Sequence, residues 1–365
     1  MLLGEAWGGN EYETRKPFVG EAGKELFLAL GEAMPAVAPE LHAEAVSQFR
    51  YGNAWHRARE PWLEAAGIAM TNVLAFRPPG NKIEALCTTK AEAGKDYAYP
   101  AIAHAKYLRA EYLSELDRLA VEIETLSPNV ICAMGNTATW AVLRTGNISA
   151  LRGTVVQACQ LTSRKVLPTY HPASILYQWS WRPILVADLI KLERESHFPS
   201  IRRPRRNVIV NPTLAELARW VDRALADRPS VLACDIETGS GQIKCIGFAR
   251  SPDDAIVVPF VDLHSEDKSG SFWPDLQSEL AAWNLCEQLL ASPIPLVGQN
   301  FIYDLQYLLP SGFRVTRVLY DTMLQHHSMF PEVKKSLGFL GSIYTDEPAW
   351  KTMRREKMDT EKRDE

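Results

Sequence analysis

Apolar and polar positions in the first half of the chain alternate in a way that predicts strands, turns and helices in succession. Short apolar runs that end in glycine, proline, asparagine or histidine predict buried strands at Leu2–Leu3 and within residues 67–80, 128–136 and 166–176. Apolar residues at helical spacing predict helices at residues 21–32, 102–126 and 137–143. Because polar residues recur where the strands end, we expect a three-layer α/β/α domain with a parallel sheet and a site along its carboxyl edge.

The pattern changes near residue 200. A basic stretch broken by proline, Ile201-Arg202-Arg203-Pro204-Arg205-Arg206, marks a linker, which is either a solvated connector or a contact to backbone phosphate. Beyond it, further helices and strands are predicted at residues 213–226, 231–237, 245–249, 255–259, 276–290 and 295–300. We therefore expect a first domain at 1–198, a linker at 199–212 and a second α/β domain at 213–365.

Composition places limits on partners and location. The 365 residues carry a formal net charge of −4, so a DNA partner would depend on local basic clusters and not on an overall field. Six cysteines occur without a Cys-x-x-Cys pair, which is typical of reduced thiols inside a cell. The chain has no signal peptide and no apolar run of about 18 residues. We therefore expect a cytoplasmic protein that does not span a membrane.

Five residues at predicted strand ends or in the opening loop form a first candidate site. Glu5 follows the first strand, Glu11 and Phe18 lie in the loop after it, and Asn72 and His171 lie at later strands. The order of the strands in the sheet could gather these side chains in one cleft. Each also has a simpler explanation, since Asn72 could form a turn, Phe18 could belong to the core, and His171 could begin a helix.

Taken together, five motifs in the first 190 residues resemble uracil-DNA glycosylases, and in particular family 4, whose members usually carry an iron–sulfur cluster. The motifs are GEAWGGNEYETRKPFVG, TNVLAFRPPGNK, VICAMGNTATWAVL, LRG at Leu151–Gly153 and LPTYHPASIL. The resemblance implies an enzyme that flips a base out of DNA into a pocket and hydrolyses its glycosidic bond.

The resemblance also implies a role for each matched residue. Phe18 would stack on the uracil ring, and Asn72 would bond the Watson–Crick edge of the base. His171 would stabilise the negative charge on the departing base. Either Glu5 or Glu11 would activate the attacking water.

Four further residues are implied in substrate contacts. Ala6, Gly135 and Asn136 would contact the pocket or the DNA backbone. Ile175 lies within Ser174–Leu176, where the family inserts an apolar wedge into the base stack. No lysine occupies a nucleophile position in these motifs, so we expect hydrolysis without a lyase step.

The sequence departs from the family pattern at two places. Trp7 stands where relatives have proline, which changes the turn after the first strand. The family's cluster cysteines are missing, because the chain begins almost at the first motif and no cysteine lies near Phe76 or Ala110. A [4Fe–4S] cluster needs four thiolates, so we expect a glycosylase without a cofactor.

A second group of carboxylates lies in the second domain. Asp235 and Glu237 share one face of a predicted strand, and Asp304 follows a later strand. This arrangement favours a shared divalent cation over a solvent-facing acidic strand, because the residues before Asp235 are apolar. The second half resembles DnaQ-like 3′–5′ exonucleases, the RNase H-like proofreading domains of phage and bacterial family A DNA polymerases. The resemblance implies Asp235, Glu237 and Asp304 as ligands of Mg²⁺ or Mn²⁺.

The third exonuclease motif, Tyr-x-x-x-Asp, is absent between Lys351 and Glu365, which indicates an incomplete exonuclease with weak activity or none. The leading hypothesis is therefore a DNA-repair glycosylase fused to a proofreading exonuclease fragment, with DNA as substrate and a DNA polymerase domain or subunit as partner. Two alternatives stay open. The exonuclease half could work in a replicase while the glycosylase half senses uracil, or the chain could be a replication adaptor without enzymatic activity.

Overall fold

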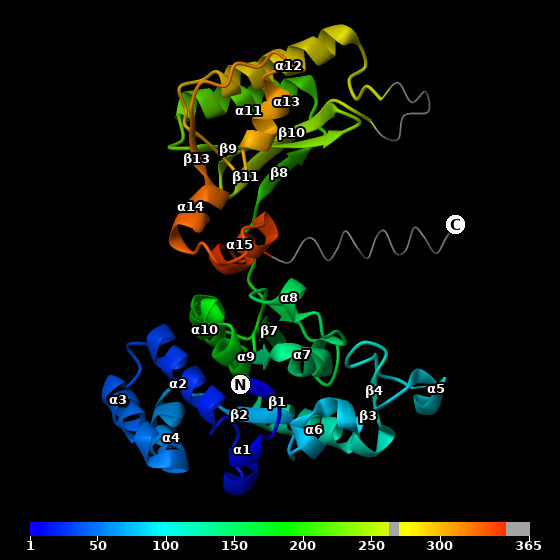
Figure 1. Cartoon of the computed structure of the whole chain (residues 1–365). Coiled ribbons are helices and arrows are strands. Elements are labelled where there is room, and N and C mark those ends of the chain that lie inside the picture. Colours follow the sequence, from blue (N-terminus) through cyan, green and yellow to red (C-terminus); the bar gives the residue numbers. More distant parts are fainter. Residues whose placement is uncertain (96, 263–269, 348–365) are drawn as a thin grey trace. The chain divides into compact units, whose positions relative to one another are not determined.

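The first strand of the chain lies between β2 and β5 in a five-stranded sheet with the order β2-β1-β5-β7-β6. Its strands pair in parallel except for β6, which is antiparallel to β7. The computed structural model describes residues 1–95, 97–262 and 270–347 (Figure 1). The strands are β1 (Leu2–Ala6), β2 (Met70–Leu74), β5 (Val130–Met134), β6 (Val156–Gln157) and β7 (Lys165–Thr169).

Helices cover both faces of this sheet, because successive strand residues point to opposite sides. Leu2, Cys132 and Leu167 pack in one core cluster with α2, α4 and α10, whereas Leu3 and Ile131 pack in another with α6 and α7. The helices are α1 (Gly9–Thr14), α2 (Glu21–Ala33), α3 (Pro39–Ser47), α4 (Trp55–Ala65), α5 (Lys90–Ala93), α6 (Ser114–Leu126), α7 (Gly135–Leu143), α8 (Ile148–Leu151), α9 (Pro172–Tyr177) and α10 (Arg182–Ser196). The three-layer α/β arrangement predicted from the sequence is confirmed.

One predicted element is wrong in extent. The helix expected at residues 102–126 begins only at Ser114, because residues before it form β4 (Tyr107–Leu108). In β4, Leu108 pairs with Cys87 of β3 (Cys87–Thr88) in a small antiparallel sheet. The pairing of Leu108 with Cys87, 21 residues earlier in the sequence, therefore outweighs the helical spacing of apolar residues around Leu108.

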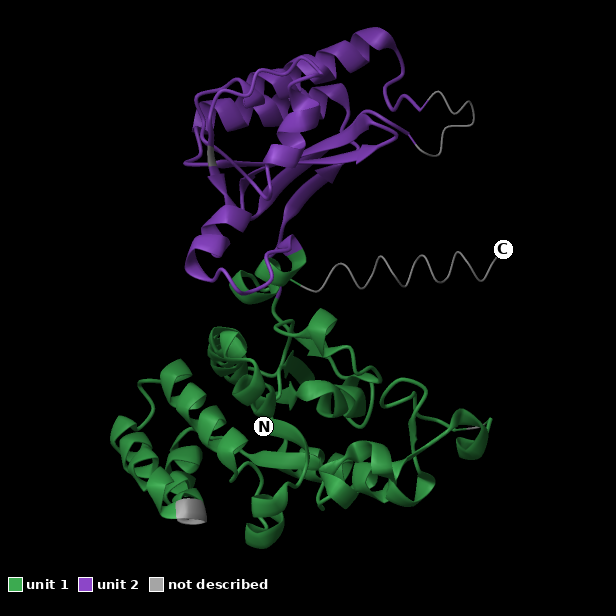
Figure 2. Cartoon of the chain, in the orientation of Figure 1, with its two compact units in different colours: residues 1–202, 338–365 green, residues 203–337 purple. Residues whose placement is uncertain are grey.

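The chain divides into two compact units (Figure 2). Unit 1 contains Met1–Arg202 and the described residues from Gly338 onward, and unit 2 contains Arg203–Leu337. Among the described residues, no helix has both the length and the apolar composition needed to cross a membrane.

Unit 2 is built on a six-stranded mixed sheet with the order β13-β12-β9-β10-β11-β8. Residues from α11 and α12 pack with Leu232, Cys234 and Phe248 of the sheet to form its core. The elements are β8 (Asn207–Val210), α11 (Leu214–Asp227), β9 (Leu232–Gly239), β10 (Gln242–Ser251), β11 (Asp254–Pro259), α12 (Leu276–Leu290), β12 (Leu296–Gly298), α13 (Ile302–Leu308), β13 (Val318–Asp321) and α14 (Thr322–Met329). Part of the expected linker is thus a strand, since β8 pairs in parallel with β11.

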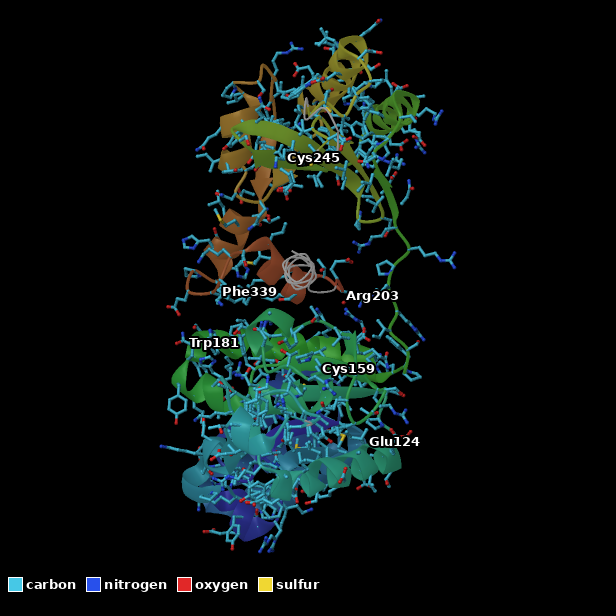
Figure 3. The ribbon with its side chains drawn as sticks, turned by 90° about the vertical axis from the view of Figure 1, so that its right-hand side faces the viewer. Glu124, Cys159, Trp181, Arg203, Cys245 and Phe339 are labelled. Atoms are coloured by element: carbon cyan, nitrogen blue, oxygen red, sulfur yellow. The ribbon has the colours of Figure 1, made fainter. Side chains whose placement is uncertain are left out.

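The helix α15 (Leu337–Tyr344) brings the end of the described chain back to unit 1. The buried Lys191 ammonium donates to the carbonyl oxygens of Gly153, Ser342 and Thr345 at 2.7, 2.8 and 2.8 Å. The Arg152 guanidinium, paired with Asp188, also donates to Ser342 Oγ and lies over the ring of Phe339. Phe339 is the residue of α15 labelled in Figure 3. The sequence predicted one continuous second domain up to residue 365, whereas these contacts group the residues from Gly338 with unit 1.

Candidate active site

A cavity of about 630 Å³ opens at the carboxyl end of the parallel sheet in unit 1. Most of the residues predicted for the first site line it, and they come from β1, α1, the loop after α1, β2, the start of α7 and the N-cap of α9. These lining residues are Glu5, Ala6, Glu11, Phe18, Asn72, Gly135, Asn136 and His171. The topology therefore gathers residues that are up to 166 positions apart, as the strand-end pattern predicted.

The loop that carries Phe18 is held by buried polar contacts. Phe18 has a left-handed backbone with φ of 54°, which costs a residue with a side chain about 1–3 kcal/mol. Glu11 Oε1 accepts hydrogen bonds from the amides of Val19 at 3.0 Å and Gly20 at 3.2 Å. The Arg59 guanidinium donates to the carbonyl oxygens of Pro17, at 2.7 Å, and of Phe18. Glu11 and Arg59 thus fix the position of the Phe18 ring.

Gly4 of β1 allows Phe18 and Asn72 to approach the same point. A Cβ at Gly4 would lie 2.2 Å from Asn72 Oδ1 and 2.6 Å from Phe18 Cζ. Both side chains are buried in the cavity wall. An aromatic face and an amide edge therefore converge where a small planar ring could bind.

His171 is held as the N-cap of α9. Its Nδ1 accepts a hydrogen bond from the amide of Ala173 at 3.2 Å, which leaves Nε2 as the protonated nitrogen of the neutral ring. Burial lowers the pKa of His171 to about 4, although the Glu11 carboxylate partly opposes this effect. The ring stacks on Phe18 with 6.0 Å between centroids. At neutral pH, His171 is therefore an uncharged donor.

Glu5 lines the same cavity in a different environment. Burial raises the pKa of Glu5, and a hydrogen bond of 2.5 Å from Thr137 Oγ1 to Glu5 Oε2 partly opposes the shift. The raised pKa favours the protonated form of this half-buried carboxyl group, which suits it to accept a proton. Sequence reasoning did not identify Thr137 or Arg59, although an arginine within the apolar stripe of α4 was a detectable signal.

One of the predicted DNA contacts, Ile175, does not lie where expected, whereas Asn136 lines the cavity. Ile175 is 0% exposed and belongs to the core, so it cannot enter a base stack without leaving the protein interior. The apolar residues exposed beside it are Leu176, Tyr177 at 91% and Trp179 at 62%. Asn136 Oδ1 accepts a hydrogen bond from the Ile148 amide at 3.3 Å, and this bond links the first turn of α7 to the start of α8.

The carboxylates of unit 2 lie near one another. Burial, with repulsion from Glu237, raises the pKa of Asp235, and burial with repulsion from Asp235 raises that of Asp304 to about 6. Asp304 Oδ1 accepts a hydrogen bond from the Ile236 amide at 2.9 Å. Within the described ranges, no three His, Cys, Asp or Glu side chains are arranged to hold a metal ion. Binding of Mg²⁺ by Asp235, Glu237 and Asp304 stays a prediction.

The residues of unit 1 do not fit the four-thiolate cluster of the resembled family. Phe76, at a family cysteine position, packs its ring against Tyr112 with centroids 5.6 Å apart. Burial in β5 raises the pKa of Cys132 to about 12, which opposes the thiolate that iron requires. Cys159 lies in unit 1 and Cys245 in unit 2 (Figure 3). We derive no chemical step through a cluster.

Comparison with known proteins agrees with the geometry of the cavity. The family model of the uracil DNA glycosylase superfamily matches residues 1–191. The type-4 uracil-DNA glycosylase of Saccharolobus solfataricus is 26% identical over 200 residues, which cover 53% of this chain and 69% of that relative. The type-4 uracil-DNA glycosylase of Sulfurisphaera tokodaii is 27% identical over 198 residues, or 53% of this chain and 67% of the relative. The chain therefore belongs to the uracil-DNA glycosylase superfamily.

Proposed function

We propose that the chain hydrolyses the N-glycosidic bond of uracil in DNA. The observation that carries this proposal is the convergence of Phe18, Asn72, His171 and Glu5 on one cavity at the sheet edge. An aromatic face, an amide and a neutral donor match the faces and edges of a flipped pyrimidine. A proton acceptor in the same cavity, Glu5, matches the water that must attack the sugar.

The bond cleavage follows from these positions. When the bond between C1′ and the base breaks, its electron pair moves onto the base, and His171 Nε2–H donates a hydrogen bond to the resulting anion. Stabilisation by a preorganised neutral donor avoids the cost of protonating His171 in a buried site. Water then adds to C1′ and gives its proton to Glu5.

Between the two glutamates, we propose Glu5 as the base. Glu11 Oε1 already accepts two backbone hydrogen bonds, from Val19 and Gly20, and these make Glu11 a positioning residue for Phe18. Burial raises the pKa of Glu5, which strengthens its affinity for a proton. The distinction is testable, because each glutamate has a different structural partner.

A second, metal-dependent function in unit 2 has weaker support. Asp235 and Glu237 lie two residues apart on one face of β9, and Asp304 lies close enough to Asp235 for their charges to interact. These carboxylates support a 3′–5′ exonuclease fragment that needs Mg²⁺ or Mn²⁺ and a polymerase partner. If such activity exists without glycosylase activity, unit 1 would be a uracil sensor or a DNA-binding module.

The test uses an end-labelled oligonucleotide with one uracil, incubated with and without EDTA and then treated with alkali. We expect one alkali-dependent product in EDTA from the natural chain and its loss in Glu5→Gln. Glu13→Gln is the matched control, because Glu13 is exposed on the neighbouring α1 and does not line the cavity. Intact uracil-DNA under excess protein would overturn the proposal. A ladder of products that disappears in EDTA would instead establish the exonuclease.

A further inference from the structure

Three residues beside the cavity form a stacked group that the proposed chemistry does not use. Arg15 follows α1 as its C-cap. Its guanidinium carbon lies 5.3 Å from the centroid of the Trp7 ring and 4.9 Å from that of the Tyr12 ring. We call Trp7, Tyr12 and Arg15 the α1 rim. Two aromatic faces thus hold one cation in a fixed orientation.

The α1 rim is continuous with the proposed base pocket. Trp7 lines the cavity, as does Glu11, which neighbours Tyr12 on α1. The Trp7 amide donates to the Phe76 carbonyl oxygen at 3.1 Å, which fixes the backbone of the rim. Tyr12 is 50% exposed, so its ring has surface available beyond the contact with Arg15.

The positive charge of the rim has no acidic partner in the part of the chain that the structure describes. Arg15 is exposed and forms no ion pair with any described carboxylate. The exposed Arg77 lies alongside, because a Cβ built on Gly9 would come within 3.7 Å of Arg77 Nη1. By contrast, the adjacent Lys16 pairs with Glu60 at 3.6 Å. In a chain with a net charge of −4, two guanidinium groups near the base pocket that form no ion pair with any described residue mark a site for an anion.

We infer that the α1 rim binds an unpaired nucleotide next to the flipped uracil, and that the chain therefore prefers single-stranded DNA. The N–H edges of Arg15 would bond the phosphate, and the exposed Tyr12 ring would stack on the base. In a duplex, neighbouring bases already cover the base faces, so the ring would contribute only to single-strand binding. This inference rests on the proposed function for the position of the flipped uracil.

The experiment compares single-stranded and duplex forms of one oligonucleotide, with and without its uracil, using the full chain. The variants are Tyr12→Leu, which removes the stacking ring, and Arg15→Gln, which removes the cation. Lys16→Gln is the matched control, because it removes the same charge one residue away and outside the rim. Thermal unfolding of each variant checks that the fold is retained.

We expect Tyr12→Leu to weaken single-strand binding and excision by roughly 10-fold, the scale of one lost base stack, and to change duplex excision by less. Arg15→Gln should weaken binding of both forms, because both present a phosphate, and Lys16→Gln should behave like the natural chain. Equal losses on both substrates in Tyr12→Leu, or a loss in Lys16→Gln equal to that in Arg15→Gln, would overturn the inference. Binding of uracil-free single strands reports on the rim even if no uracil is excised, so failure of the proposed function is seen separately.

Discussion

Replacing Arg59 by methionine should disable the cavity while leaving most of the fold intact. Arg59 is 1% exposed on α4, and its guanidinium donates to the carbonyl oxygens of Pro17 and Phe18. Burial lowers the pKa of Arg59 to about 10, so the group is still charged at neutral pH. Methionine retains the apolar stem but provides no donor for either carbonyl.

The size of the effect follows from these two contacts. Each buried carbonyl that loses its donor costs about 1–3 kcal/mol, although removal of a buried cation returns part of that cost. The left-handed backbone of Phe18 is the strained element that these bonds hold, so much of the loss should appear as movement of this loop. At about 1.4 kcal/mol for each factor of ten, we expect kcat/KM to fall between about 10- and 100-fold.

The assay pairs urea unfolding with single-turnover excision of uracil. Trp62→Phe is the matched control, because Trp62 lies on the same helix, is buried, and donates its Nε1–H to Val37 O at 2.8 Å. Arg59→Met should lose more activity than Trp62→Phe at equal loss of stability. If the two variants fall on one line of activity against stability, Arg59 has no positioning role and the reasoning is refuted.

Three further changes probe the same cavity. In the folded chain the pKa of His171 is lowered to about 4, so the unfolded chain gains a proton near pH 6.5 that folded His171 does not accept. The free energy of unfolding should therefore fall as the pH drops from 6.5 towards 4. A His171→Gln variant should lose this part of the pH dependence in urea titrations. In Thr137→Val the pKa of Glu5 should rise further, because the hydroxyl that opposes the shift is gone. The acid limb of the pH–rate profile should therefore move to higher pH. An unchanged profile would contradict the role of Glu5. In Gly4→Ala the added Cβ would lie 2.6 Å from Phe18 Cζ, which should lower the free energy of unfolding by about 1–3 kcal/mol. Excision should be impaired beyond what this loss of stability explains, because the ring is displaced. Normal excision would show that the Phe18 ring need not lie there.

Much of the fold could be predicted because local patterns determine it. The helix expected at residues 276–290 has the same bounds as α12. The strands β2 and β5 of unit 1 lie within the apolar runs that predicted them. The errors occur where a distant strand decides the outcome. Leu108 pairs with Cys87, and Asn207–Val210 pairs with β11, and neither partner is visible in the local spacing.

The residues of the candidate site could be predicted where they lie at or near the end of a strand. Glu5, Asn72 and His171 each follow from the position of a strand, and the parallel sheet brings them together. The roles of Glu11 and Arg59 could not be read in this way, because both depend on which backbone groups the Phe18 loop presents to them.

The return of α15 to unit 1 has a consequence for how the polypeptide can be divided. A fragment ending at Arg202 would leave the Lys191 ammonium with one of its three carbonyl acceptors, that of Gly153. A single protease cut inside unit 2, however, would leave both pieces joined by the contacts of Lys191 and Arg152 with the returning segment. Unit 1 is therefore discontinuous in sequence, and a nicked chain should migrate as one particle until those buried contacts are broken.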